Sequence, residues 1–338
     1  MVVCAWTEER LELLKENIAS LERQTLPPAE IIVAVDHNPE LLALARDAFP
    51  DHLVVENREP RGASGPKNTA LLHASGEVVA FIDDDAFADE HWLEAVAEAY
   101  EDGTTIGTGG RLTPIWVEGR PLWFPPEFDW VVGCSYRGEA DGRTAVRNPI
   151  GANMSFRRDV FARTGGFSAD LGRLRCEETE FAMRATARTG GWIMHVPDAT
   201  VRHVVPAARA TWSYFLRRCW LEGRSKAIVA RRVGSEAALR RERSYVVTTV
   251  PSGLVRALRR ALGGDAAGFG EAAAIVVGLA AAATAYFWGR ASQAAITTLR
   301  AHGGSPRGDD ATGGADRSSR RSRHAGDPDG ARGRPSSH

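Results

Sequence analysis

Cysteine is scarce in this 338-residue sequence, and its cysteines lie far apart. There are four, at Cys4, Cys134, Cys176 and Cys219, and no two of them form a CxxC pair. Because structural zinc sites and disulfide-stapled domains need closely spaced cysteines, the sequence argues against both and suits a reducing compartment. The chain opens directly on the strand-like run MVVCAW, so we expect no secretory signal peptide.

Two further absences concern the C-terminal part of the chain. Residues 301–338 contain no Val, Ile, Leu, Met, Phe, Trp or Tyr, so they cannot build a core and we expect a disordered tail. Residues 272–289 carry no charged side chain over 18 positions. At ~1.5 Å per residue, a helix of this length reaches about 27 Å, close to the thickness of the hydrocarbon core of a bilayer. We therefore expect an apolar helix in 266–300 that associates with a membrane or crosses it.

Charge is unevenly distributed, although the net charge is only -1. Residues 1–208 carry 33 acidic and 20 basic side chains, whereas residues 209–260 carry 3 acidic and 13 basic ones. Arginines alternate with aromatic and leucine residues in 209–265, which predicts basic amphipathic helices. A basic segment of this kind fits an anionic surface, and nucleic acid and an acidic membrane leaflet both meet that description.

The first hundred residues alternate between strand-like and helix-like patterns. Continuous apolar runs such as EIIVAVD and EVVAFIDDD indicate buried strands, and segments with helical spacing of apolar residues separate them. The alternation predicts an α/β fold with a Rossmann-like, mainly parallel sheet flanked by helices. Ligands of such sheets bind beyond the carboxyl ends of the strands. From about residue 110 the alternation is lost, and the tract PIWVEGRPLWFPPEFDW indicates a loop-rich insertion.

Acidic residues follow two of the predicted strands. Asp83, Asp84 and Asp85 end one strand, and Asp36 ends another. Adjacent carboxylates repel one another unless a cation neutralises them, and divalent cations prefer oxygen ligands, so the run predicts a metal site. The alternative for the run is an acidic turn that caps the next helix, and the alternative for Asp36 is a plain turn aspartate.

Three further stretches carry candidate chemistry. RGASGPKN is a glycine-bearing loop that leads into a helix, an arrangement suited to anions, and Lys67 adds a positive charge there. CEETE places Glu177 and Glu178 at the start of a helix, where the helix dipole alone also favours acids. His203 follows a predicted strand, and a lone histidine in such a place is often structural.

Taken together, these motifs resemble glycosyltransferase family 2, whose members have the GT-A fold. The resemblance covers roughly residues 1–230 and rests on the order of the motifs along the chain. In that order stand an opening strand followed by Thr7-Glu8, the strand that ends on Asp36, then RGASGPKN, FIDDD, GANMSFRR, CEETEF, VRH and EGRSKA. GT-A architecture and sugar transfer from a nucleotide-sugar donor are the expectations that follow.

The resemblance also implies donor-binding roles by position. The residues that it assigns to the donor are Thr7, Glu8, Asp36, Lys67, Asn68, Asp83 and Asp84. Among them, Asp36 would contact the nucleobase, and Asp83 would face the ribose or the waters of a bound metal. Asp84 is expected to point away with the pleat of its strand and to matter least.

The metal and the catalytic base are implied in the same way. Asp85, together with Asp83 and His203, would hold Mg2+ or Mn2+ that bridges the donor diphosphate. Glu178 would be the general base that deprotonates the acceptor hydroxyl. The usual acidic pair of the family is Glu-Asp, so Glu177 stays open as the other candidate.

The implied activity is inverting, metal-dependent sugar transfer, with a UDP-linked donor and a lipid-linked glycan acceptor. The tract FPPEFDWVVGCSYRG looks like that of enzymes which add a glucuronosyl or similar sugar to polyprenyl-linked glycosides. The basic segment and the apolar run agree with this, which favours a membrane surface over nucleic acid as the partner. Because nucleotide sugars are cytoplasmic, we expect the protein at the cytoplasmic face of the cell membrane, attached peripherally or by a single pass.

Two alternatives remain open from the sequence. A nucleotidyltransferase also uses aspartates at strand ends, but it gives CEETE no necessary role. A non-catalytic nucleotide-sugar-binding membrane protein would keep the donor site without the chemistry. The expected organisation comprises a catalytic domain, a basic amphipathic helical segment, an apolar helix and a tail, at 1–208, 209–265, 266–300 and 301–338.

Overall fold

The computed structural model describes residues 1–171, 176–233 and 243–302. Apart from residues 301 and 302, which end the last helix, the predicted disordered tail lies outside the described residues. The chain divides into two compact units, 1–295 and 296–338. The elements that carry the candidate site all belong to the first unit.

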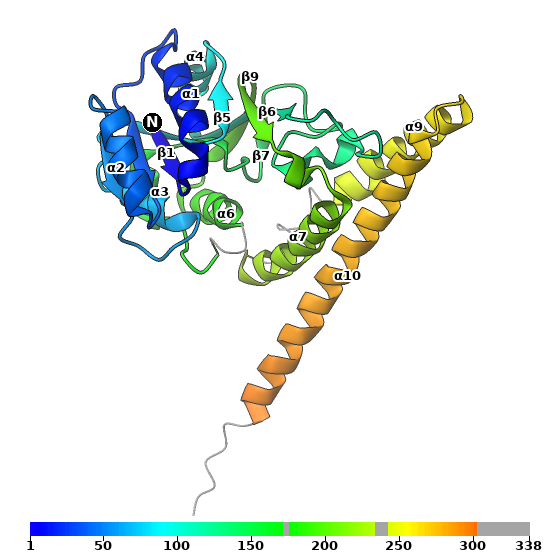
Figure 1. Ribbon diagram of the computed structural model, residues 1–338. Helices are drawn as coiled ribbons and strands as arrows, with labels where there is room; N and C mark the ends of the chain where they lie inside the picture. Colours follow the sequence, from blue (N-terminus) through cyan, green and yellow to red (C-terminus); the bar gives the residue numbers. More distant parts are fainter. Residues whose placement is uncertain (172–175, 234–242, 303–338) are drawn as a thin grey trace, which may run out of the picture. The chain divides into compact units, whose positions relative to one another are not determined.

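Strands and helices alternate over the first hundred residues, as the apolar pattern predicted (Figure 1). In chain order the elements are β1 (Val2–Ala5), η1 (Glu8–Arg10), α1 (Leu11–Glu22), β2 (Ile32–Val35), α2 (Pro39–Ala48), β3 (Leu53–Glu56), α3 (Ser64–Leu71), β4 (Val78–Asp83), β5 (Ala86–Ala88) and α4 (Trp92–Glu98). Local chemistry sets the ends of these elements. The side chain of Asn38 caps α2 by accepting a hydrogen bond from the Leu41 N–H at 3.0 Å, and proline occupies the first helical turn.

The chain beyond residue 100 contains more regular structure than its sequence indicated. Its elements up to residue 205 are β6 (Thr105–Trp116), η2 (Pro126–Val132), β7 (Thr144–Val146), β8 (Asn153–Arg157), α5 (Arg158–Thr164), α6 (Glu177–Thr189) and β9 (Trp192–Val205). The predicted loop-rich insertion is therefore loop only in part, because β6 runs through Trp116 and η2 buries Phe128. The glycines of β6 made this strand hard to predict from the sequence. They are required because a Cβ at Gly107 or Gly110 would collide with β8 or β9.

The strands form one nine-stranded sheet within the described residues, with the path β3-β2-β1-β4-β8-β6-β9-β5 and with β7 paired to β9. Pairing is parallel from β3 to β4 and between β6 and β9. The other four pairings are antiparallel. The expected mainly parallel sheet is thus correct for the first hundred residues, while the whole sheet is mixed because β8 inserts antiparallel between β4 and β6.

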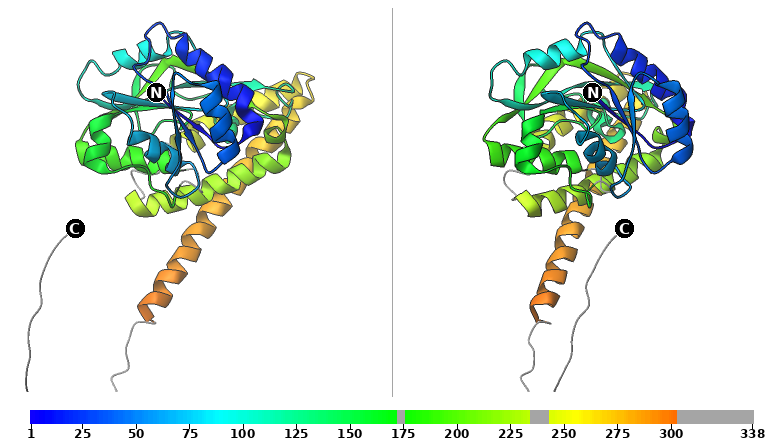
Figure 2. Two further views of the ribbon diagram at one scale, coloured as in Figure 1. Left: turned by 60° about the vertical axis from the view of Figure 1, so that its left-hand side comes forward. Right: turned by 90° about the vertical axis from the view of Figure 1, so that its left-hand side faces the viewer.

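Helices cover both faces of the sheet (Figure 2). Alternate residues of β1 point to opposite faces: Val3 packs with α1, α2 and α4, whereas Val2 packs with α3, α5 and α6. The same alternation at the end of β4 sends Ile82 to the α1 side and Phe81 to the α6 side. This pleat decides where the acidic side chains that follow β4 can point.

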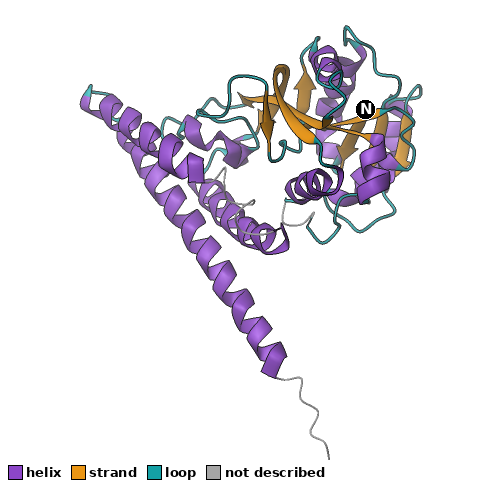
Figure 3. Cartoon of the chain, turned by 180° about the vertical axis from the view of Figure 1, so that it is seen from behind, coloured by secondary structure: helices purple, strands orange, loops and turns teal. Residues whose placement is uncertain are grey.

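The C-terminal part of the described chain is helical, as predicted (Figure 3). Its elements are η4 (Ala207–Arg209), α7 (Trp212–Val233), η5 (Tyr245–Thr249), α9 (Val250–Leu262) and α10 (Ala267–His302). Among the described residues, one stretch, Ala267–Ser292 of α10, is long and apolar enough to cross a membrane. Of its most apolar window, 28% is buried within the protein, so it is not an isolated helix.

Helix α9 is amphipathic, and two of its arginines, Arg256 and Arg260, contact buried glutamates, whereas Arg259 is exposed. The guanidinium of Arg256 lies 2.9 Å from Glu127 and 2.6 Å from Glu271, and Arg260 also reaches Glu271 at 2.6 Å. Both glutamates are buried. The apolar side chains exposed instead are Val255, Leu258 and Leu262. This ion-pair cluster ties α9 and α10 to η2, and it leaves apolar surface facing outward.

Candidate active site

The carboxyl ends of parallel strands bring the predicted acidic residues to one edge of the sheet. β1 lies between β2 and β4, with Ala5 beside Val35 and Cys4 beside Asp83. Asp36 follows β2 directly, and its backbone N–H donates to the carbonyl of Ala5 at 2.8 Å. Asp36 and the aspartates after β4 therefore share the edge at which ligands of such sheets bind.

Strand pairing brings His203 to this edge. β5 follows the aspartates immediately and pairs with β9, in the register Ala86 to His203. Ligand atoms of Asp83, Asp85 and His203 consequently lie within 4.8 Å of one another, and His203 Nε2 is 3.2 Å from Asp85 Oδ1. The other ring nitrogen, Nδ1, is 3.6 Å from the Sγ of Cys134. This contact fixes the imidazole from behind, as groups around a metal ligand commonly do.

Positive charge surrounds Asp85. Arg10 lies 2.9 Å from its carboxylate and Arg209 lies 3.5 Å from it. Burial raises the pKa of Asp85, but His203, Arg10 and Arg209 more than offset burial, and the pKa falls to about 2. The carboxylate is therefore ionised at every physiological pH.

The donor set of this cluster fits a divalent cation. Two carboxylates and one imidazole offer hard oxygen ligands and a nitrogen ligand, a combination that transition ions such as Mn2+ accept. The three ligand atoms converge from a turn after β4 and from β9, so no rearrangement of the sheet is needed to bring them together. Asp83, Asp85 and His203 thus form a candidate metal site, in the positions that the sequence predicted.

Asp84 contacts the same guanidinium nitrogen of Arg10 that Asp85 contacts, but it is not part of the candidate metal cluster. Its Oδ1 accepts a hydrogen bond from Arg10 at 2.7 Å, and the side chain is only 2% exposed. Burial raises the pKa of Asp84 to about 7 against the lowering effect of Arg10. Asp84 orients Arg10 and lies outside the candidate metal cluster, so a direct donor contact by Asp84 forms no part of the function proposed below.

The two glutamates at the start of α6 have different surroundings, and the difference separates their roles. Glu177 is buried, and its Oε1 accepts a hydrogen bond from Lys67 Nζ at 2.8 Å. Burial alone would lower the pKa of Lys67, but Glu177, Asp83 and Glu178 overcome this, and the pKa is raised. Lys67 and Glu177 therefore form a permanent buried ion pair between α3 and α6.

Glu178 is half-buried and lines a cavity of about 400 Å3. Desolvation raises its pKa to about 8, with a further increase from Glu177, and Lys67 acts against both. Its carboxylate accepts a weak hydrogen bond from Thr179 at 3.5 Å and one from a backbone N–H. A carboxylate with a raised pKa that faces a cavity is suited to accept a proton, which favours Glu178 over Glu177 as the base.

Two glycines that were assigned no role in the sequence join these groups. The Cβ position at Gly151 would lie 3.8 Å from Lys67 Nζ and 3.9 Å from Glu178 Cγ. Gly133 lines the same cavity as Glu178, and its Cβ position would lie 3.4 Å from the ring of His203. The cavity therefore reaches from Glu178 to the neighbourhood of the candidate metal site.

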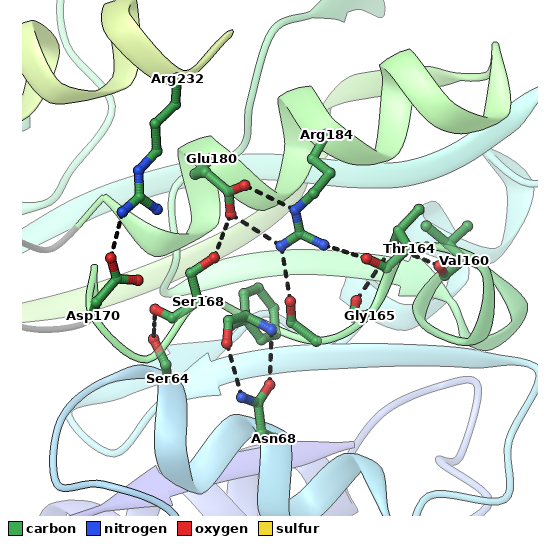
Figure 4. A network of polar contacts seen from close by, with 12 residues as sticks. Ser64, Asn68, Val160, Thr164, Gly165, Ser168, Asp170, Glu180, Arg184 and Arg232 are labelled. Carbon is green, nitrogen blue, oxygen red and sulfur yellow. Dashed lines mark hydrogen bonds and ion pairs between the residues drawn. The ribbon is translucent and has the colours of Figure 1, made fainter. Parts of the chain in front are cut away.

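A polar network fixes α6 against α3 (Figure 4). Glu180 accepts hydrogen bonds from Ser168 and Arg184, and Ser64 of α3 donates to the carbonyl of Ser168 at 2.9 Å. The Asn68 amide binds the backbone of Phe167 through both of its polar atoms. These bonds hold the start of α6 in place. The observed role of Asn68 is structural, and its predicted contact with a donor is left out of the function proposed below.

The remaining predicted donor residues lie along the edge of β1 and β2. Asp36 is buried, and its carboxylate accepts hydrogen bonds from Asn57 at 2.6 Å and from the Gly62 N–H at 3.1 Å. It thereby holds the loop that leads into α3. Thr7 precedes η1, and the exposed Glu8 accepts a hydrogen bond from Asn38 at 2.7 Å. Their roles toward a donor stay predictions.

Arg10 and Arg209 were not identified from the sequence. Each contacts Asp85, although Arg209 stands 124 residues away from it. Arginines are common in this chain, and neither stands in a motif. The signal that could have found Arg10 is its place two residues after Thr7-Glu8, just beyond the opening strand.

Comparison with known proteins agrees with this geometry. The family model described as glycosyl transferase family 2 matches residues 1–165. A Haloferax volcanii protein named glucosyl-dolichyl phosphate glucuronosyltransferase is 34% identical over 238 residues, which are 68% of this chain and 76% of the relative. The Rhizobium meliloti succinoglycan biosynthesis protein ExoM is 25% identical over 230 residues, or 66% of this chain and 72% of that protein.

A solved structure shows the same architecture. The mannosyltransferase of Pyrobaculum calidifontis, in complex with GDP-Man and Mn2+, matches with a TM-score of 0.56 and 21% identity. The match covers 85% of this chain and 86% of the other. At this identity the likeness concerns the fold. With the family model and the Haloferax relative, it establishes that the chain belongs to glycosyltransferase family 2, has the GT-A fold and is a glycosyltransferase.

Proposed function

We propose that the protein is an inverting glycosyltransferase that depends on a divalent cation. In this proposal it moves a sugar from a nucleotide-sugar donor, UDP-linked, to a hydroxyl of a lipid-linked glycan. The observation that carries the proposal is that Glu178, with its pKa raised to about 8, lines a cavity whose wall also includes Gly133, beside His203 of the candidate metal site. Membership of the family removes the nucleotidyltransferase alternative. A non-catalytic binding protein would have no use for such a base.

Glu178 performs the proton transfer in this mechanism. Its carboxylate accepts the proton of the acceptor hydroxyl, and the oxygen attacks the anomeric carbon from the side opposite the nucleoside diphosphate. The bond between the anomeric carbon and the diphosphate oxygen breaks as the new bond forms, so the configuration inverts. With a pKa of about 8, Glu178 is partly ionised at mildly alkaline pH, and the ionised form takes up the proton.

The remaining residues bind and orient the donor. Asp83, Asp85 and His203 would hold Mg2+ or Mn2+, which stabilises the negative charge of the leaving diphosphate when it is bound. Arg10 and Arg209 add positive charge on the same side. The nucleoside side of the donor is assigned to the carboxyl edge of β1 and β2, with Thr7, Glu8 and Asp36 as the contacts.

Glu177 and Lys67 position the site and do not take part in the transfer. Their ion pair holds α6 at a fixed distance from α3. One carboxylate oxygen of Glu177, Oε2, is buried and has no hydrogen-bond partner among the described residues. Glu177 does not line the cavity, so its role in this proposal is to hold Lys67 and the start of α6 in place.

The lipid-linked acceptor and the location at the cytoplasmic face of a membrane are supported by two observations. The Haloferax relative is named for a glucosyl-dolichyl phosphate substrate. The C-terminal helices carry exposed apolar side chains, among them Leu262, Phe269 and Phe287, beside a basic segment. Soluble nucleotide sugars and a membrane-bound acceptor meet only at such a surface.

A donor panel with matched variants tests the proposal. The purified full-length protein is assayed with UDP-, GDP- and TDP-linked sugars and dolichyl phosphate glucose, with Mn2+, with Mg2+ and with EDTA, and NMR identifies the anomer formed. We expect transfer that requires the metal and inverts the anomeric centre. Glu178→Gln should retain metal-dependent donor binding and lose transfer, whereas Asp85→Asn should lose both. Transfer by Glu178→Gln at the wild-type rate, or retention of configuration, would contradict the mechanism.

A further inference from the structure

The cavity that contains Glu178 has two kinds of wall. The walls from α6, from residues 147–150 and from α7 are mainly polar and include Glu178, Asn148, Glu222 and Lys226. The wall from α10 is apolar apart from one phenol, and it consists of Leu279, Ala282, Ala283, Tyr286 and Phe287. A ligand that fills this cavity must therefore be amphipathic, with a polar part at Glu178 and an apolar part along α10.

The apolar wall continues onto the surface of the protein. The exposed positions of α10 between residues 269 and 288 recur at intervals of three and four residues, so they lie on one face of the helix. We call this face the apolar stripe, and it consists of Phe269, Ala273, Val276, Val277, Ala280, Ala283, Thr284, Phe287 and Trp288. Ala283 and Phe287 belong to the stripe and also line the cavity, and Phe287 is 68% exposed. The cavity thus opens onto the stripe.

The opposite face of α10 packs against the protein. Its glycines permit this: Gly268 lies on the backbone of α9 at Ala257, and Gly278 lies against Phe128 and Phe215. Gly289 packs against Ala227 of α7 in the same way. A helix covered along one side by protein cannot be surrounded by lipid, so residues 267–289 do not suit a single transmembrane pass.

Charge on the neighbouring helix supports the same conclusion. Arg224 of α7 is exposed and lies over the ring of Trp288, 5.6 Å from its centre. If α10 spanned the bilayer, the charge of Arg224 would be carried toward the hydrocarbon, which is unfavourable. A helix lying in the membrane interface inserts only its apolar stripe and leaves the arginine at the headgroups.

We propose that this cavity is the acceptor site and that a lipid-linked acceptor enters it sideways from the membrane, through the opening at Ala283 and Phe287. The inference rests on the proposed transfer to a lipid-linked glycan and adds its route. The hydroxyl to be glycosylated reaches Glu178, and the first part of the lipid chain lies along Leu279, Ala282 and Phe287. The rest of the chain stays in the leaflet into which the apolar stripe inserts.

The size of the cavity favours this occupant over a soluble oligosaccharide. A volume of about 400 Å3 holds a small-molecule head but not a long lipid chain, so the chain must leave through an opening. The opening lies among apolar side chains, where lipid is the natural continuation. A free oligosaccharide would place its hydroxyls against Leu279, Ala283 and Phe287, which offer no side-chain hydrogen bonds, and it would lose its bonds to water.

A matched pair of substitutions on α10 tests the route kinetically. Ala283→Trp closes the opening, whereas Ala273→Trp adds the same bulk to the stripe at a position that does not line the cavity. Both alanines are exposed, so neither substitution threatens folding. In vesicles with dolichyl phosphate glucose as the acceptor, Ala283→Trp should raise the acceptor KM about tenfold or more, which corresponds to about 1.4 kcal/mol of lost binding. The donor KM should stay unchanged, and Ala273→Trp should resemble the wild type in both constants.

Equal acceptor KM values for the two variants would overturn the inference while leaving the proposed function intact. If the wild type itself transfers sugar to neither dolichyl phosphate glucose nor its short-chain analogue citronellyl phosphate glucose, the proposed function fails instead. The two failures are therefore distinguishable.

Photo-crosslinking tests the route without turnover. A benzophenone amino acid replaces Phe287 in one preparation and Phe269 in another, since both are exposed stripe residues at 68% and 60% but only Phe287 lines the cavity. In phospholipid vesicles that contain dolichyl phosphate glucose, the probe at Phe287 should capture the glycolipid in excess of its share of the membrane. The probe at Phe269 should capture lipids in proportion to composition. Proportional capture at both positions would contradict the lateral route.

Discussion

The two acidic centres of this protein use the same type of side chain for opposite purposes. At the end of β4, Arg10, Arg209 and His203 lie against Asp85, and its pKa falls to about 2. At the start of α6, desolvation raises the pKa of Glu178 to about 8, and the nearest cation, Lys67, is already paired with Glu177. In the proposed mechanism, Asp85 is kept charged for a cation, while Glu178 takes up a proton. Environment, and not residue type, assigns the two roles.

The same contrast separates the two neighbours within α6. Glu177 and Glu178 are adjacent, but about 100° of helical rotation directs one toward Lys67 and the other toward the cavity. Substitutions that remove a single charge should therefore give opposite results at the two positions, in activity and in stability.

The largest expected effect is the loss of catalysis in Glu178→Gln. The amide keeps the shape of the side chain but cannot accept the proton, so kcat should fall on the order of 10²–10⁴-fold, the usual contribution of general base catalysis. Steady-state transfer kinetics at saturating Mn2+ measure the effect. The binding constant of the donor should remain within about twofold of the wild-type value, a change of only ~0.4 kcal/mol. A loss of donor binding equal to the loss of kcat would mean that Glu178 acts at the donor.

The next largest effect is the destabilisation in Glu177→Gln. This change leaves the buried ammonium of Lys67 without its partner, and breaking a buried ion pair typically costs about 3–5 kcal/mol of the free energy of unfolding. Urea denaturation of the full-length protein measures it, with Glu178→Gln as the matched control. The double variant Glu177→Gln, Lys67→Met removes both charges and should recover much of the loss. No loss in Glu177→Gln would show that the ion pair does not hold α6 and α3 together.

A smaller effect concerns the stabilisation by metal. A cation that binds only the folded protein at a hundred times its Kd should raise the free energy of unfolding by about 2.7 kcal/mol. Thermal unfolding with Mn2+ and with EDTA measures the increment. Asp85→Asn should abolish it, whereas Asp84→Asn should keep it, because Asp84 contacts Arg10 and is not part of the cluster. Equal increments in the two variants would place the metal elsewhere.

Much of this architecture could be predicted from local patterns in the sequence. The remainder depends on contacts between segments that are distant in the sequence. The strands β1 to β4 and the helices between them were predicted because their periodicity is local. β6 was not predicted, because its glycines are not typical of a strand. They are present because they allow close packing against β8 and β9. The contact of Arg256 in α9 with Glu127 was not predicted either, since Glu127 stands more than a hundred residues away.

The candidate site shows the same division. Asp83 and Asp85 could be recognised as candidates because they end a predicted strand. Only the pairing of β5 with β9 in the fold brings His203 to them. Whether Glu177 or Glu178 is the base could not be decided from the sequence, because the answer depends on the helix phase relative to Lys67, 110 residues earlier. Gly133 and Gly151 could not be predicted as site residues, because they have no side chain with a recognisable chemistry. Gly133 lies beside His203, and Gly151 lies beside Lys67 and Glu178.

The last effect that we predict is a difference in the pH dependence of stability between the wild type and Glu178→Gln. The pKa of Glu178 rises from its ordinary value of 4.5 to about 8 on folding, so between these pH values the folded protein binds more protons than the unfolded chain. The contribution of this group to the free energy of unfolding is therefore full below about pH 4.5 and is lost as the pH rises to about 8. Glu178→Gln lacks this loss. In EDTA, its stability relative to the wild type should increase across that window and stay level above it, as denaturation midpoints at successive pH values would show. A constant difference would mean that the carboxyl of Glu178 keeps its ordinary pKa. In that case the comparison between the two acidic centres would rest on the lowered pKa of Asp85 alone.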